Sequence, residues 1–311
     1  DAMEALTRAV ELGADGSVVY GLLGYAYASS NNFLAAESAY RRAILLQPDS
    51  ADWKLGLARA LFGQRKYSDA VALCDQLIAR DPDRAAYWQL QANAYLGLDK
   101  PMRAAENFEY LRALGQADTA TLNRLADIYF RENMVDVAAG IYADAMTEDG
   151  AGPERYISRA QMLAMQGARE EAGTLLSEIR NQFSERLTSD QQTDLLRIQA
   201  RVARSAGQDE EQARLLEEIV ELDPTDGEAL IQLGRRYARQ DDPAKAVFYF
   251  ERAAAIEETE AKAKIRHAQL LVQQARYREA IPLLESALRI EHRDEVAEYL
   301  EQVEAAAKSQ Q

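Results

Sequence analysis

A 34-residue periodicity is the feature that most constrains the fold of this chain. One alanine column returns at every 34th residue in the first half of the sequence and resumes later: Ala2, Ala36, Ala70, Ala104, Ala138 and Ala172, then Ala246 and Ala280. Similarity at a fixed step of this size indicates an array of stacked structural repeats. The 311 residues are also more than one small globular core would use.

Three further columns keep the same step. Small residues form one: Gly24, Ala58, Ala92, Ala126, Ala160, Gly234 and Ala268. Large residues form two, namely Tyr27, Leu61, Tyr95, Tyr129, Leu163, Tyr237 and Leu271, and Leu6, Tyr40, Cys74, Phe108, Tyr142, Leu176, Phe250 and Leu284. Apolar positions spaced three and four apart mark helices, and a turn such as Ser30-Asn31-Asn32 divides each repeat. Each repeat is therefore predicted to be two antiparallel helices, with the small columns where their backbones approach closely.

These columns resemble the tetratricopeptide repeat. The repeat from Ser17 carries the pattern in Tyr20, Leu23-Gly24, Tyr27, Ala36, Tyr40, Ala43 and Pro48. The resemblance covers essentially the whole chain. It implies an all-α, right-handed α-solenoid, a superhelix of antiparallel helix pairs, with about eight repeats plus an N-terminal half-repeat and a C-terminal capping helix.

The repeat boundaries follow from the columns. Five regular repeats span 17–186 (17–50, 51–84, 85–118, 119–152 and 153–186), and three more span 193–293 (193–226, 227–260 and 261–293). Residues 187–192 are an insertion, and the repeat after it is degenerate, since Ala213 lies one position late. Residues 1–13 match only the second helix of a preceding, truncated repeat. Residues 294–311 are predicted as a capping helix and a disordered tail, and an irregular joint is expected at the insertion.

Composition and charge restrict the function. The formal net charge is −15, which weighs against a nucleic-acid partner, including RNA bound by a pentatricopeptide-like array. No apolar run is long enough to suggest membrane insertion. A single cysteine and two histidines argue against a disulfide, a metal site or a Cys–His nucleophile. Cys74 and His267 fall at packing positions, so we expect no enzyme, no catalytic residue and no cofactor.

The resemblance implies a partner-binding groove lined by the first helix of each repeat. Carried over repeat by repeat, its positions in the first four repeats are Tyr25, Arg59, Phe62, Gln89, Asn93, Asn123, Arg124, Asp127, Phe130 and Arg131. In the last three repeats they are Arg197, Arg201, Arg204, Arg235, Arg239, Lys262 and Arg266. The basic set favours an acidic partner segment, because arginine binds carboxylates in a bidentate manner. The alternative is that these cations pair with glutamates of neighbouring helices.

The expected function is a protein–protein interaction scaffold or adaptor that binds a protein or peptide. The chain is expected to belong to a bacterial multi-repeat protein, because alanine and arginine are frequent and lysine is sparse. A bacterial envelope, secretion or transport complex is the expected setting, with the periplasm favoured over the cytoplasm. The alternative is a substrate-recognition arm of a larger enzyme or machine whose other domains lie outside this sequence. A chaperone-tail clamp is not expected, because Gln89 and Arg124 replace its lysine and asparagine next to Asn93.

Overall fold

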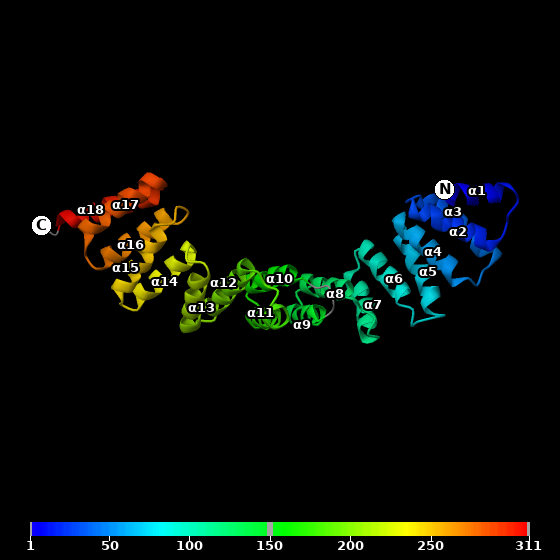
Figure 1. Ribbon diagram of the computed structural model, residues 1–311, viewed down its shortest axis with the longest axis horizontal. Helices are drawn as coiled ribbons and strands as arrows, with labels where there is room; N and C mark the ends of the chain where they lie inside the picture. The colour runs from blue at the N-terminus through cyan, green and yellow to red at the C-terminus, as the bar shows by residue number, and fades with distance from the viewer. Residues whose placement is uncertain (1, 148–151, 310–311) are drawn as a thin grey trace. The chain divides into compact units, whose positions relative to one another are not determined.

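The computed structural model describes residues 2–147 and 152–309, and all the regular secondary structure in these ranges is helical. The chain divides into two compact modules, residues 1–151 and residues 152–311, which we call the N-terminal and C-terminal modules. Within each module every helix packs against the next one (Figure 1). The prediction of an all-α array of helix pairs is confirmed.

The N-terminal module contains a single helix followed by four helix pairs. The single helix is α1 (Ala2–Glu11), and the pairs are α2 (Ser17–Ser29) with α3 (Phe33–Leu46), α4 (Ala51–Gly63) with α5 (Tyr67–Ile78), α6 (Ala85–Gly97) with α7 (Pro101–Ala113), and α8 (Thr119–Arg131) with α9 (Val135–Met146).

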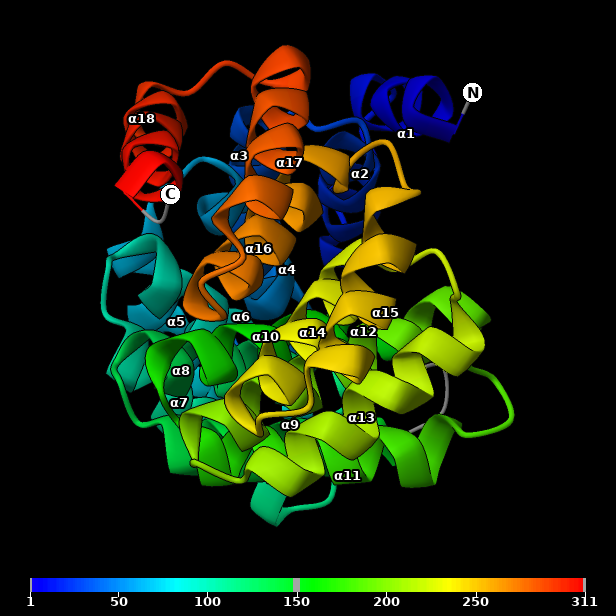
Figure 2. The ribbon, with the colours of Figure 1, turned by 90° about the vertical axis from the view of Figure 1, so that its left-hand side faces the viewer.

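The C-terminal module contains four pairs and a final helix. The pairs are α10 (Pro153–Gln166) with α11 (Arg169–Phe183), α12 (Ser189–Ser205) with α13 (Asp209–Leu222), α14 (Gly227–Arg239) with α15 (Pro243–Ala254), and α16 (Glu260–Gln273) with α17 (Tyr277–Ile290). The final helix, α18 (Asp294–Ser309), packs against α17 (Figure 2). The tail predicted after it falls mainly on residues 310 and 311, which lie outside the described residues.

The alanine column lies in the core of both modules. Its members from Ala36 to Ala280 are all fully buried, while the side chain of Ala2 lies outside the described residues. The small-residue column faces the second helix of the same repeat: a Cβ on Gly24 would lie 2.9 Å from the Tyr40 ring, and one on Gly234 would lie 2.5 Å from Phe250. These columns are therefore small because the two helices of each pair touch there.

The turn between the two helices has the same backbone geometry in every repeat. One residue in each turn has a left-handed φ between 56° and 83°: Asn31, Arg65, Asp99, Asn133, Gly167, Gly207, Asp241 and Ala275. This conformation favours glycine and tolerates asparagine and aspartate, but it is unfavourable for alanine.

Replacing Ala275 with glycine is expected to raise the free energy of unfolding by about 1 kcal/mol, because the strain of a Cβ at positive φ disappears. Ala275 is exposed, so no packing is lost. The converse change, Gly167→Ala, should lower stability by a similar amount. Equilibrium denaturation of both variants tests the pair. A destabilised Ala275→Gly variant would contradict the explanation.

The predicted insertion lengthens a helix. Helix α12 begins at Ser189, preceded by a capping box in which Thr188 and Gln191 bond each other's backbone N–H groups. Residues 189–192 thus form its first turn. In α13 the alanine position, 34 residues before Ala246, holds Gln212, and Gln212 and Ala213 are both buried. The Gln212 amide donates to the Gln232 side chain at 3.3 Å, which compensates the burial of a polar group.

The residues that could suggest catalysis lie where packing places them. Cys74 is fully buried, as predicted, and burial raises the pKa of its thiol to about 12. His267 is half-buried against the Phe250 ring, with 6.4 Å between ring centroids, and burial lowers its pKa.

A carboxylate links the first two repeats. Glu37 on α3 is mostly buried, and it accepts hydrogen bonds from Lys66, Gln64 and Arg41 at 2.8–2.9 Å. These donors, Lys66 foremost, lower the pKa of Glu37 to about 2. Its charge therefore stabilises the fold above the unfolded-state pKa of about 4.3.

The stabilisation by Glu37 should be lost as the pH falls from about 5 to about 2, because the folded state then binds the proton less tightly than the unfolded state. The Glu37→Gln variant should lower the free energy of unfolding at neutral pH, because it removes the charge that Lys66 and Arg41 pair with. The loss should be only about 1–2 kcal/mol, because solvent screens these two partly exposed cations. The stability of the variant should also fall less steeply in that pH window. Urea denaturation across the window tests this, and parallel pH profiles of the two proteins would contradict it.

Candidate partner-binding surface

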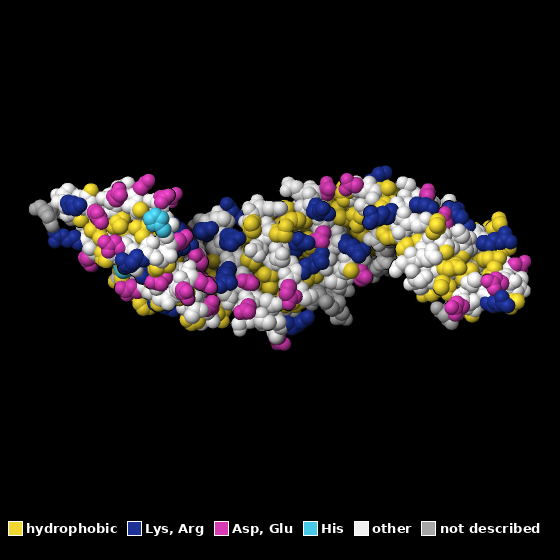
Figure 3. Space-filling model, turned by 90° about the horizontal axis from the view of Figure 1, so that it is seen from above, with side chains coloured by type: hydrophobic (Ala, Val, Ile, Leu, Met, Phe, Trp, Pro, Cys, Tyr) yellow, Lys and Arg dark blue, Asp and Glu magenta, His cyan; other side chains and the backbone are white. Residues whose placement is uncertain are grey.

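The first helices of the repeats in the C-terminal module carry the predicted basic residues. Helices α12 and α14 line one cavity of about 540 Å³ with Arg197, Arg201 and Arg204 from α12 and Glu228 and Gln232 from α14. Helix α14 in turn packs against α16. Acidic and basic side chains are interspersed over the face shown in Figure 3. Whether a cation is available to a partner must therefore be decided residue by residue.

Two of the predicted cations are neutralised within the module. Arg197 bonds Asp226 at 2.8–2.9 Å and Asp194 at 3.1 Å. Lys262 contacts both carboxylate oxygens of Glu228, at 2.5 and 2.6 Å. Arg197 and Lys262 therefore pair with carboxylates of the same or a neighbouring helix, which was the alternative to binding a partner. We leave both residues out of the candidate site.

The other five arginines form what we call the arginine cluster: Arg201, Arg204, Arg235, Arg239 and Arg266. In residues 2–147 and 152–309, none of the five forms an ion pair with a carboxylate, although Arg266 donates to the Gln269 amide oxygen at 2.8 Å. Partial burial lowers the pKa of Arg235, and repulsion from Arg266, Arg239 and Arg204 lowers it further. The cluster is thus a local excess of positive charge in a chain of net charge −15.

The positions of the cluster within the helices help to explain how the fold tolerates it. Arg204 and Arg239 lie in the last turns of α12 and α14. The negative end of the helix dipole favours cations there, by about 0.3–1 kcal/mol each. The helix dipoles offset the positive charge of these arginines only in part. An anionic ligand would neutralise the rest by accepting hydrogen bonds from the paired N–H groups of each guanidinium.

Sequence reasoning missed the acidic part of the same cavity. Asp223, Asp226 and Glu258 line it together with the arginines of α12, and Asp226 pairs with Arg197. Asp226 is also the N-cap of α14, accepting from the Ala229 N–H at 2.9 Å. An aspartate directly before a helix is a recognisable cap signal, so this residue could have been placed from sequence. A partner would meet a surface with a basic and an acidic part.

Three of the predicted groove residues in the N-terminal module serve the core. Phe130 is 8% exposed and Asn123 is 6% exposed, and Asn123 donates to the Thr119 carbonyl at 2.9 Å. Phe62 packs on the Tyr67 ring, with 5.4 Å between centroids. Phe130 and Asn123 are thus buried and Phe62 is partly buried by packing, and the expectation that they face a partner stays a prediction.

The remaining predicted residues of this module are more accessible. Tyr25, Arg59 and Arg131 are exposed, and Gln89 is half-buried. Arg124 donates to the Asn93 side chain at 2.9 Å, which connects α8 to α6, and Asp127 accepts from the Tyr142 hydroxyl at 2.5 Å. Among the described residues of this module, the structure therefore joins one predicted pair, Arg124 with Asn93, and forms no cluster of one charge.

Comparison with known proteins agrees with the helix pairs. Two family models described as tetratricopeptide repeat match residues 27–94 and 90–154. A comparison with curated proteins gave no match.

Several solved structures are similar in fold. The C-terminal part of a tetratricopeptide-repeat protein of Cytophaga hutchinsonii is 16% identical, covers 78% of this chain and 98% of that chain, and gives a TM-score of 0.49. YrrB, described as a tetratricopeptide protein with an unusual peptide-binding site, is 17% identical, with coverages of 62% and 96% and a TM-score of 0.42. A tetratricopeptide-repeat protein of Parabacteroides merdae is 13% identical, with coverages of 92% and 98% and a TM-score of 0.35. Because all three TM-scores are below 0.5, these structures carry no argument about this chain.

The repeated helix pairs define the class as an all-α helical-repeat protein. The matched models identify repeats of the tetratricopeptide family over residues 27–154, and the same columns of buried residues continue from Ala160 to Ala280. Proteins of this family are generally non-catalytic scaffolds that bind proteins or peptides. Within the described ranges, no helix combines the length and apolar character needed to span a membrane.

Proposed function

We propose that this chain is a non-catalytic scaffold that binds an acidic segment of a partner protein at the arginine cluster. The observation that carries the proposal is the set of five neighbouring arginines for which the described residues supply no ion-paired carboxylate. A carboxylate-rich segment would relieve the repulsion that lowers the pKa of Arg235.

The setting is a further part of the proposal. We place the scaffold in a bacterial envelope, secretion or transport complex, on the periplasmic side. The frequent alanine and arginine and the sparse lysine support the bacterial origin, and the complex and the compartment are proposed together with it.

The salt dependence of peptide binding tests the proposed site. A labelled, glutamate-rich peptide should bind with an affinity that falls about tenfold or more between about 0.05 M and about 0.5 M salt, because added ions screen exposed charges. The same peptide with glutamine in place of glutamate serves as the control and should bind far more weakly. An affinity independent of salt, or equal for both peptides, would exclude an electrostatic site.

A further inference from the structure

A second surface, on the outer side of α15, stands out by comparison of the repeats with one another. Phe248 is 54% exposed. At the same position the other seven repeats hold Ser38, Ala72, Glu106, Gly140, Thr174, Arg214 and Pro282, and all of them are exposed. Since these residues are small, polar or charged and the repeats fold alike, the fold does not require a large apolar side chain there.

The residues on either side of Phe248 also depart from neighbouring repeats. Lys245 and Arg252 lie three positions before it and four positions after it, which places all three on one helix face. The residues equivalent to this cationic pair are Glu211 and Glu218 in α13, and Glu279 and Ser286 in α17. We call Lys245, Phe248 and Arg252 the α15 stripe. Its net charge is positive, whereas the equivalent positions of the two neighbouring repeats carry a net negative charge.

Contacts with aromatic rings hold the stripe in place. Phe248 packs edge-on against Tyr249, with 5.3 Å between centroids, and Tyr249 stacks on Tyr237 at 5.5 Å. Arg252 lies over the Phe248 ring at 5.6 Å, and Lys245 lies over the Tyr237 ring at 4.9 Å. Side chains ordered in this way lose less conformational entropy when a partner binds.

The cations of the stripe remain available. Lys245 has one long ion pair, with Asp242 at 3.6 Å, and its side chain is 60% exposed. Within the described part of the chain, Arg252 forms no ion pair with a carboxylate, and its guanidinium lies over the Phe248 ring. The helical rise places the Cα atoms of Lys245 and Arg252 about 10 Å apart along the helix, with the exposed Phe248 between them in the sequence.

We propose that the α15 stripe is a second docking surface, for an acidic protein segment that carries an aliphatic side chain between two carboxylates. The carboxylates would pair with Lys245 and Arg252, and the aliphatic group would cover Phe248. Charge complementarity selects this occupant, because an apolar partner without carboxylates would leave both cations unpaired. The surface lies on the second helix of its repeat, so it is separate from the arginine cluster on the first helices.

The test uses a labelled, capped helical peptide. Its two glutamates lie about two helical turns apart, and a leucine lies between them, about one turn from each. Fluorescence anisotropy should show binding to the full chain and a loss of about tenfold or more for Phe248→Ser. The matched control is Arg214→Ser, which makes the same exposed position serine in the neighbouring repeat and should leave the affinity within about twofold. Denaturation curves of both variants should match the parent protein, because both positions are exposed.

Three outcomes would overturn the proposal. The first is no binding of the peptide at about millimolar concentration. The second is equal binding by Phe248→Ser and the parent protein. The third is Phe248-dependent self-association in analytical ultracentrifugation, which would make a second copy of the chain the occupant. The Arg201→Glu, Arg235→Glu protein should keep binding at the α15 stripe, so failure of one proposal is distinguishable from failure of the other.

Discussion

Reversing the charge of Arg201 and Arg235 together is expected to weaken binding of a glutamate-rich peptide by about 100-fold, or about 2.7 kcal/mol. Each reversal removes a charge-assisted hydrogen-bond donor and introduces a carboxylate that repels the ligand. Arg235 should contribute most, because Arg204, Arg239 and Arg266 are close enough to act on its pKa. Isothermal titration calorimetry at low salt measures the loss.

The control for this prediction must change net charge equally without touching the cluster. Arg214 on α13 is exposed and pairs with Glu211 at 2.6 Å. Arg214→Glu combined with Arg80→Glu, a second exposed arginine in the other module, gives the same charge change. Its effect should stay within about threefold. Equal losses in the two double variants would show that net charge alone governs binding.

The fold was predictable because its determinants are local and repeated. The alanine column and the small-residue column mark close contact between the helices of one pair, and both keep a 34-residue step. The turn residues from Asn31 to Gly167 and from Gly207 to Ala275 keep that step too, and the insertion lengthens the one step between Gly167 and Gly207 to 40 residues. Ala275 keeps the turn although its residue type disfavours the geometry. A register repeated eight times thus specifies the backbone even where one residue fits poorly.

The candidate site was less predictable because it depends on pairs between repeats. Glu228 and Lys262 are exactly one repeat apart, so aligning the repeats could have placed them side by side. Arg197 and Asp226 are 29 residues apart, and no fixed step relates them. It was also hard to predict which first-helix residues face the groove and which face the core. Phe62 and Phe130 occupy equivalent positions at the edge of the packed face, and aromatic residues there turn toward the core because burial is favourable.

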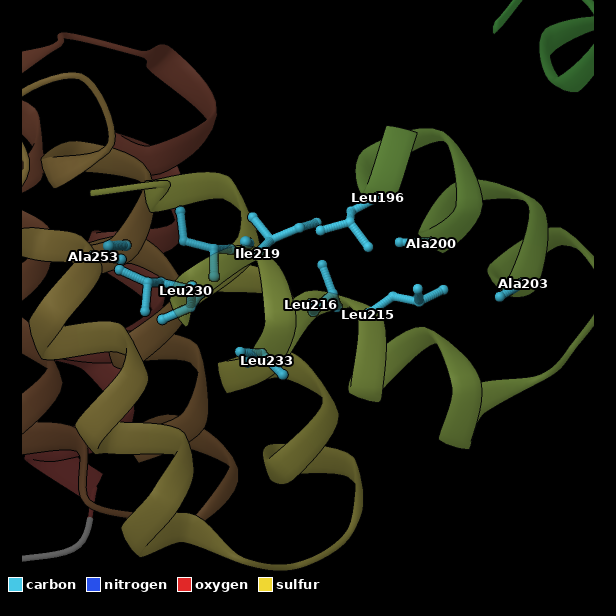
Figure 4. Packing of buried hydrophobic residues seen from close by; sticks show 13 residues of the cluster. Leu196, Ala200, Ala203, Leu215, Leu216, Ile219, Leu230, Leu233 and Ala253 are labelled. Atoms are coloured by element: carbon cyan, nitrogen blue, oxygen red, sulfur yellow. The ribbon is translucent and has the colours of Figure 1, made fainter. Parts of the chain in front are cut away.

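Truncating Leu230 to alanine is expected to lower the free energy of unfolding of the C-terminal module by about 3 kcal/mol. Leu230 is fully buried in a cluster formed by α12 to α16. Figure 4 shows it between Ile219 of α13 and Ala253 of α15. Its loss would leave a cavity where three consecutive helices meet, and the rigid helix pairs can close it only in part. Urea denaturation followed by circular dichroism measures the change.

The control for this prediction is Leu222→Ala. The chemical change is identical, but Leu222 on α13 is 46% exposed. That variant should lose much less, about 1 kcal/mol or below, because no enclosed cavity forms. In a repeat array each repeat contacts only its neighbours, so stability is a sum of repeat terms and interface terms. Leu230 contributes to both the repeat term and the interface term, because it packs against α15 of its own repeat and against α13 of the preceding repeat. Equal losses for the two variants would mean that helix propensity, rather than packing between repeats, holds the module together.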